Sequence, residues 1–362
     1  MSPVAVKSLA GRLSNAFLAA GAVPVEAEAL QPAEVLLDLY GEDIRARAYV
    51  TDDPVDAEQM LRPDFTVPVV QMHMADGAEP ARYTYNGPVW RKQEPGAGRA
   101  KEYLQVGFEL FDRHDPAASD AEVFALFHEI LKPYGLRMAT GDVGLLAAAI
   151  DGLTTTARRK ERLRRQIWRP DRFHHLLDMY SGKAENLPTR IALLDQVEAK
   201  GAKAVLKAAG PLLGVRSEAE IMARVASLQM DATTRPIPEN EVEALEELLA
   251  LHGPAADALQ TLRGVEDRLN GFAPAVDRLE ARLNAMAAQG VNVETLPFEA
   301  SFGLTSLEYY DGFVFGFFDG ETPISSGGRY DALTAVLGQG RSIPAVGGVI
   351  RPDALAAVGG VA

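Results

Sequence analysis

The side chains best suited to binding chemistry lie in residues 82–111, where two strand-like runs flank a loop rich in Gly and Pro. Polar and apolar residues alternate in the second run, which predicts a strand with one apolar face and one wet or functional face. Gln105 and Glu109 share the second face, Arg91 ends the first run and Arg99 lies on the loop. These groups suit an amino acid with a nucleotide beside it. An ordinary solvated β-hairpin is the alternative interpretation.

Composition sets broad limits on what this chain of 362 residues can be. The length allows two domains, or one domain with a large insertion. A net charge of −14 argues against general nucleic-acid binding. The absence of cysteine removes disulfides, thiol nucleophiles and Cys-ligated metals. No signal peptide is recognisable at the N-terminus, and no apolar run approaches the ~18 residues of a membrane span, so we expect a cytoplasmic protein.

Local patterns predict a mixed α and β chain. Ser2 caps an amphipathic helix that ends at Gly21, and Ser119 with Glu122 forms a capping box for a helix that packs in the core. Another amphipathic helix precedes Gly290. Extended segments are expected at residues 23–30, 47–51 and 291–296, and in an aromatic run that reaches residue 318.

Residues 151–272 differ from the rest because strand signals fade and helical patterns dominate. This segment contains a basic run between Arg158 and Arg165, whose simplest interpretation is a solvated helix face and whose alternative is contact with an acidic partner. His174 and His175 would diverge by about 100° on a helix, and no carboxylate stands at ligand spacing. We therefore expect no metal site here.

Several segments together resemble the histidyl-tRNA synthetase family, in the order that family has them. The helix, the glycine and the proline-containing extended segment up to Pro32 resemble motif 1 of class II synthetases, which forms their dimer interface. The other similar segments are LRPDFT at 61–66, GPVWR at 87–91, YLQVGFELF at 103–111, LTSLEYY at 304–310, SGGRYD at 326–331 and PAVG at 344–347. GPVWR and YLQVGFELF correspond to motif 2, and PAVG begins like motif 3.

The resemblance implies an α+β fold, a class II aminoacyl-tRNA synthetase-like antiparallel sheet of about six strands flanked by helices. Residues 1–150 and 273–362 would form the catalytic-core-like domain, and 151–272 a helical insertion. Because the sequence ends at Ala362, we expect it to lack the anticodon-binding domain that follows motif 3 in the synthetases.

The resemblance also implies a histidine-binding pocket. In that family a carboxylate at the position of Asp64 receives the α-ammonium group, with Thr66 supporting it, and the tyrosines face the imidazole. Phe65 replaces a family glycine, and Asp64 replaces a longer glutamate. The implied histidine-binding set is Asp64, Thr66, Arg91, Gln105, Glu109, Tyr309, Tyr310 and Tyr330, with Arg91 and Arg99 as candidate phosphate or other anion contacts.

The nucleotide chemistry of the family is not retained. Thr305 and Ala354 stand where the synthetases have arginines, and Gln93 stands where they have a glutamate. Pro352 falls where the motif 3 helix should continue, and Arg351 is out of register. Without those charges the developing charge of adenylate formation is not stabilised. We expect no catalytic residue, cofactor or metal in this chain.

A histidine pocket without activation chemistry resembles the family of regulatory subunits of hetero-oligomeric ATP phosphoribosyltransferases. That resemblance implies a short catalytic subunit as partner, self-association as a dimer, histidine as ligand, and neither nucleic acid nor membrane as partner. It places the chain in the first step of histidine biosynthesis and its feedback regulation. One alternative is a truncated synthetase-like enzyme that activates histidine with ATP, which the retained Arg91 and Arg99 favour. A tRNA-binding paralogue is a third reading, which the net charge of −14 opposes.

Overall fold

The computed structural model describes residues 2–93, 100–184, 187–212, 214, 216–303 and 309–358. The chain forms two compact units. The sheet unit comprises Met1–Leu145, Leu249–Gly264 and Ala273–Ala362, and the helical unit comprises Leu146–Leu248 and Val265–Phe272. The sheet unit thus includes residues 249–264, which the sequence patterns assign to the helical insertion. Within the described ranges, no helix combines the length and the apolar character that crossing a membrane requires.

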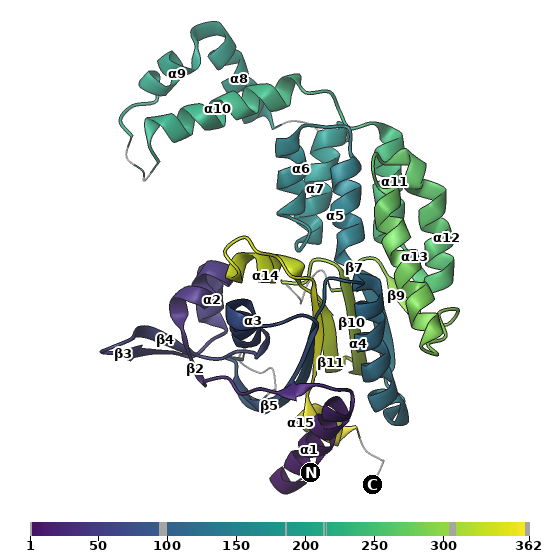
Figure 1. Cartoon of the computed structure of the whole chain (residues 1–362). Helices are drawn as coiled ribbons and strands as arrows, with labels where there is room; N and C mark the ends of the chain where they lie inside the picture. The colour runs from purple at the N-terminus through teal and green to yellow at the C-terminus, as the bar shows by residue number, and fades with distance from the viewer. Residues whose placement is uncertain are drawn as a thin grey trace. The chain divides into compact units, whose positions relative to one another are not determined.

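A nine-stranded sheet, ordered β1-β5-β6-β12-β11-β10-β7-β9-β8, forms the centre of the sheet unit (Figure 1). Its strands are β1 Val23–Pro24, β5 Ala81–Trp90, β6 Glu102–Phe111, β7 Arg137–Asp142, β8 His252–Pro254, β9 Pro297–Glu299, β10 Phe313–Asp319, β11 Thr322–Arg329 and β12 Ala345–Ile350. The six longer strands from β5 to β7 are antiparallel neighbours. The expected antiparallel sheet flanked by helices is confirmed, with short strands added at both edges.

A small antiparallel sheet, β2-β4-β3, lies in the same unit. Its strands are β2 Leu30–Pro32, β3 Val50–Asp53 and β4 Ala57–Leu61, accompanied by α2 Ala33–Tyr40 and the 3₁₀ helix η1 Gly41–Ala46. The extended segment expected at 23–30 is therefore divided between two sheets. The strand expected at 291–296 is wrong, because β9 begins only at Pro297 and residues 293–295 form a turn.

Helices cover the sheet. They are α1 Pro3–Ala19, α3 Thr66–Asp76, α4 Pro116–Leu131 with η2 Lys132–Tyr134, α13 Ala273–Ala288, α14 Asp331–Leu337 and α15 Pro352–Ala357. As expected, Ser2 caps α1, accepting a bond from the amide of Ala5 at 3.3 Å, and Gly21 follows with φ of +86°. Helices α1 and α15 pack together, so the two ends of the described chain meet (Figure 1).

Helix α4 supplies much of the core, although its expected start is wrong. Asp115 rather than Ser119 is the N-cap, because Pro116 at the first helical position starts the helix a turn earlier. Glu122 is not part of a capping box and instead pairs with Arg82. The buried side of α4 packs on the sheet, where the rings of Phe127 and Phe315 lie 5.4 Å apart.

Every regular element described in the helical unit is a helix. They are most of α5 Val143–Gly152 and of α11 Glu239–Ala250, with α6 Ala157–Arg164, α7 Pro170–Ser181, α8 Pro188–Lys200, α9 Ala202–Ala208, α10 Glu218–Thr233 and η3 Glu266–Arg268. Helix α12 Ala255–Val265 belongs almost wholly to the sheet unit. A buried ion pair joins α6 to α10, with Nε of Arg159 lying 3.2 Å from Oδ1 of Asp231.

Candidate functional site

Glu109 is the centre of a buried polar cluster in the sheet unit, and its side chain accepts three hydroxyl hydrogen bonds. Thr66 and Tyr85 each donate to Oε1 at 3.0 Å, and Tyr330 donates to Oε2 at 2.6 Å. The residue is 1 % exposed. The donors come from the start of α3, from β5 and from the residue after β11, so three separate segments meet at one carboxyl group, which we call the Glu109 cluster.

The cluster holds a carboxyl group that titrates near neutrality. Burial raises the pKa of Glu109 to about 7, although the hydrogen bonds from Tyr330, Thr66 and Tyr85 oppose that rise. The nearby charge of Asp64 raises it further. A cation placed beside Glu109 would favour the charged form, so the site is suited to a positively charged guest.

Gln105, on the same strand, is completely buried and makes no side-chain hydrogen bond in the described structure. Its exposed fraction is 0 %, and both its amide nitrogen and its amide oxygen lack partners. An unpaired buried polar group costs about 1–3 kcal/mol. Because Gln105 and Glu109 point to the same side of β6, a ligand that bonds the amide would also reach the cluster.

The polar side of β6 is buried rather than wet, so of the two expected forms, a wet face or a functional face, the wet one is excluded. All residues from Gln105 to Phe111 are buried. The apolar face packs on α1 and α4, whereas aromatic rings cover the face that carries Glu109. The alternative of a solvated hairpin does not fit this burial.

Asp64 and Arg91 lie beside the cluster. Nη2 of Arg91 is 3.9 Å from Oδ2 of Asp64, and its Nε donates to the carbonyl of Pro63 at 2.7 Å. Burial raises the pKa of Asp64, and the charge of Arg91 opposes that rise. The amide of Val67 donates weakly to the same carboxyl group at 3.4 Å. A carboxylate and a guanidinium are therefore available next to Glu109.

The three tyrosines assigned to the site lie together. The ring centroid of Tyr309 is 4.6 Å from that of Tyr310 and 6.3 Å from that of Tyr330, and Tyr310 lies 6.4 Å from Tyr330. Burial raises the pKa of each, to about 12 for Tyr309. Their hydroxyl groups keep their protons at neutral pH, and Tyr330 donates its proton to Glu109.

Two glycines, neither of them among the predicted site residues, make room for the cluster. Gly347 on β12 pairs with Glu109, and a Cβ atom there would lie 1.6 Å from the carboxyl oxygen Oε2. A Cβ atom at Gly107 would lie 2.1 Å from the ring of Tyr85. The signal in the sequence was glycine inside strand-like runs, which marks close approach of another group.

Phe65 has a structural role where the synthetases have glycine. Its ring stacks on Tyr85 at 4.5 Å, and the guanidinium of Arg62 lies 4.0 Å from the centre of its other face. Gly87 makes this possible, because a Cβ atom there would lie 2.8 Å from the Phe65 ring. Phe65 therefore holds the tyrosine that donates to Glu109.

Arg329, in the segment SGGRYD, anchors the turn that presents Tyr330. Its Nη2 donates to Oδ1 of Asp120 at 2.7 Å, and its Nη1 donates to Asp331 at 3.0 Å. Asp120 also accepts from Arg282 at 3.3 Å. These bonds bind the end of β11 to α4 and α13, so Tyr330 reaches Glu109 from a fixed position.

The structure corrects the prediction that Pro352 interrupts the helix of the motif 3-like segment. Pro352 is the first residue of α15 and begins the helix rather than interrupting it. Arg351 occupies the N-cap position of that helix without a side-chain capping bond, and it donates to the hydroxyl of Ser326 at 3.0 Å. Ala354 lies inside α15. Arg99, the candidate anion contact, and Thr305 lie outside the described residues.

Arg351 was missed as a site residue. Burial lowers its pKa, and it interacts electrostatically with Tyr103, Arg91, Tyr310 and Tyr309. Its guanidinium is thus a positive charge that acts on these tyrosines in addition to that of Arg91. Only the folded structure reveals this, because in the sequence Arg351 is out of register with the arginine of motif 3.

Comparison with known proteins identifies similar families. The family model described as histidyl-tRNA synthetase matches residues 4–232 and 222–355. ATP phosphoribosyltransferase regulatory subunits of Agrobacterium fabrum and Allorhizobium ampelinum are each 32 % identical to this chain. The former match covers 99 % of both chains, and the latter 96 % of both.

Solved structures share the fold. A Bacillus halodurans protein described as an ATP phosphoribosyltransferase regulatory subunit/histidyl-tRNA synthetase aligns with a TM-score of 0.68 and 22 % identity, over 98 % of this chain and 79 % of its own. The histidyl-tRNA synthetase of Nostoc aligns with a TM-score of 0.62 and 18 % identity, over 97 % and 70 %. At these identities the likeness concerns the fold alone.

Proposed function

The chain belongs to the family of ATP phosphoribosyltransferase regulatory subunits, which share the histidyl-tRNA synthetase fold, and from that premise we propose that it binds histidine and regulates a separate catalytic subunit. The complex would catalyse the first step of histidine biosynthesis by joining ATP to phosphoribosyl pyrophosphate. Histidine binding to this chain would convey feedback inhibition.

The observation that carries this proposal is the pair of Gln105 and Glu109. An amide without partners and a carboxyl group with a pKa of about 7 share one buried strand face. Histidine offers an imidazole that can be charged or neutral near the same pH, together with an α-ammonium group. Glu109 and the tyrosines suit the imidazole, and Asp64 with Thr66 suits the ammonium.

The histidine carboxylate would be met by a guanidinium. Arg91 lies beside Asp64, so a ligand whose ammonium contacts Asp64 places its carboxylate near that arginine. We therefore propose Asp64, Thr66, Arg91, Gln105, Glu109, Tyr309, Tyr310 and Tyr330 as the histidine-binding residues.

In this proposal the chain has no catalysis of its own. Ala354 occupies the place at which the synthetase family has an arginine against adenine, and Gln93 replaces a glutamate. The competing function, histidine activation by a truncated synthetase-like enzyme, gains some support from Arg351. That guanidinium lies near Arg91 and could contact an anionic group.

We expect self-association and binding of the short catalytic subunit. Val23 and Leu30, in the segment that resembles motif 1, are 58 % and 43 % exposed, and β1 lies at a sheet edge. Light scattering should give a dimer or larger species, and a still larger one after the catalytic subunit is added. Val23→Glu should shift the first species toward monomer.

Val336→Glu is the matched control, because Val336 is equally apolar and 59 % exposed but lies on α14. Its assembly should equal that of the wild type. A wild-type monomer that stays unchanged after addition of the catalytic subunit would refute the proposed assembly.

A further inference from the structure

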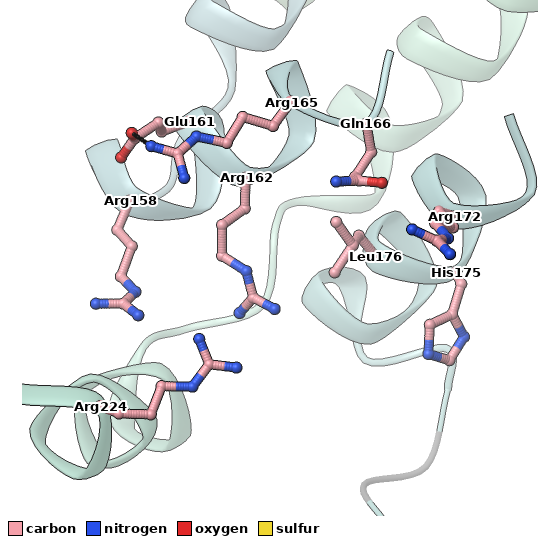
Figure 2. A pocket seen from close by; sticks show the side chains of 9 residues that line it. All are labelled: Arg158, Glu161, Arg162, Arg165, Gln166, Arg172, His175, Leu176 and Arg224. Carbon is pink, nitrogen blue, oxygen red and sulfur yellow. Dashed lines mark hydrogen bonds and ion pairs between the residues drawn. The ribbon is translucent and has the colours of Figure 1, made fainter. Parts of the chain in front are cut away.

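The helical unit contains a cavity of about 560 Å³ with an excess of positive charge (Figure 2). Five arginines and one carboxylate contribute its charged lining. They are Arg158, Arg162 and Arg165 from α6 and its C-terminal end, Arg172 from α7, Arg224 from α10, and Glu161. We call this feature the arginine cavity.

The helix period explains how a basic run becomes one wall of a cavity. Arg158, Arg162 and Arg165 are four and three residues apart, so they lie along one face of a helix. Figure 2 shows Arg158 and Arg162 pointing toward α10, from which Arg224 points back at them. Guanidinium groups from two helices that are distant in sequence therefore converge.

Neighbouring carboxylates do not balance this charge. Arg165 pairs with Glu161. Asp231 lies 3.4 Å from Arg162, but it also forms ion pairs with Arg159 at 3.2 Å and with Arg190 at 3.7 Å. One carboxylate is thus shared among three guanidinium groups, which leaves donors of Arg162 available.

The other arginines are less paired still. Arg158 donates to the hydroxyl of Ser227, and its Nε is buried without a hydrogen-bond partner. Neither Arg172 nor Arg224 forms an ion pair within the described residues. Like charges held together without counter-charges repel one another, so binding an anion would stabilise this arrangement.

We propose that the arginine cavity binds a nucleoside di- or triphosphate. Guanidinium groups bind phosphate oxygens through paired hydrogen bonds, and several of them around one cavity suit adjacent phosphates. The volume lies within the range of small-molecule sites. The proposal rests on residues of the helical unit alone and does not depend on histidine binding elsewhere.

Two further lining residues favour a nucleoside over a bare polyphosphate. The side-chain oxygen Oε1 of Gln166 is buried without a donor, so it can accept a hydrogen bond from a base N–H or a ribose O–H group. Leu176 adds an apolar, largely buried contact for a base. His175 completes this side of the cavity.

Shape and charge favour this small anion over RNA. The chain as a whole carries a net charge of −14, which opposes general binding of nucleic acid. The concave lining suits a compact ligand better than a flat acidic protein surface.

Calorimetric titration of the full-length protein with ATP, without magnesium, tests the proposal. We expect one site whose affinity falls as salt rises. Arg172→Glu with Arg224→Glu should weaken binding at least tenfold, and Arg278→Glu, which reverses an exposed arginine on α13, should change it less than twofold. Tripolyphosphate should bind more weakly than ATP.

Two outcomes would overturn the proposal. The first is absence of ATP binding, or ATP binding that the double charge reversal leaves unchanged. The second is an RNA duplex or acidic peptide that binds more tightly than ATP and is lost in the same variant. Thermal melts and a histidine titration check folding, and Arg172→Gln with Arg224→Gln repeats the test if the charge reversal unfolds the protein.

Discussion

Glu109→Gln should weaken histidine binding about 10- to 150-fold, which corresponds to about 1.5–3 kcal/mol. Glutamine keeps the shape, and its amide oxygen can accept the bonds from Thr66 and Tyr85, whereas its amide nitrogen would have to donate to Tyr330. The substitution removes the charge that a protonated imidazole or ammonium group would meet. Calorimetric titration with histidine measures the change. Glu102→Gln is the matched control, because Glu102 lies on the same strand β6 and is exposed.

The same variant has a signature in stability. Burial raises the pKa of Glu109 to about 7 from its ordinary value of 4.5, so the folded protein holds this proton more tightly than the unfolded chain. The resulting stabilisation is complete below about pH 4.5 and is lost as the pH rises through 7, by up to about 3 kcal/mol. In urea melts, the free energy of unfolding of Glu109→Gln relative to that of the wild type should therefore increase progressively from pH 4.5 to pH 8.

An unchanged histidine affinity in a folded Glu109→Gln variant would show that histidine does not bind at the Glu109 cluster. The site would then have to lie elsewhere, such as at the interface with the catalytic subunit. A stability difference that does not vary with pH would show that Glu109 does not titrate in this range.

Histidine-dependent exchange of pyrophosphate into ATP should be undetectable. The synthetase family stabilises the developing adenylate with arginines, and this chain has Thr305 and Ala354 at those positions. Losing one such electrostatic contact costs about 10²–10³ in rate, so the loss of two reduces exchange by several orders of magnitude. A histidyl-tRNA synthetase assayed in parallel is the positive control.

Exchange at a rate comparable to that control would establish the competing function. In that case Arg351 would be the first residue to substitute, because its guanidinium interacts electrostatically with Arg91, Tyr309 and Tyr310. Arg351→Ala should then abolish the exchange.

Local sequence patterns correctly predicted those features of the fold that depend only on residues close together in the chain. The alternation in residues 103–111 put Gln105 and Glu109 on one strand, and Ser2 with Pro3 marked the start of α1. The capping box at Ser119 failed because a stronger local signal, Asp115 followed by Pro116, competes with it. Short-range rules therefore misplace an end when two signals lie within one turn.

The closest contacts of the site depend on pairings that no local pattern contains. Tyr85 reaches Glu109 because β5 and β6 pair with Tyr85 opposite Gly107, and a shift of one residue would turn it to the other side of the sheet. Gly347 meets Glu109 only because β12 is the next strand. Local patterns likewise do not predict that Arg224 lines the arginine cavity, because only the fold of the helical unit brings it close to the basic run.

The steady-state rate of the short catalytic ATP phosphoribosyltransferase subunit, measured with and without this chain and at increasing histidine concentrations, decides whether the chain is regulatory. We expect the chain to raise the rate and histidine then to lower it, and we expect Glu109→Gln to retain the activation while shifting the histidine response to higher concentration. A rate that does not respond to the chain, or activation that histidine leaves unchanged, would show that the chain does not have this regulatory role.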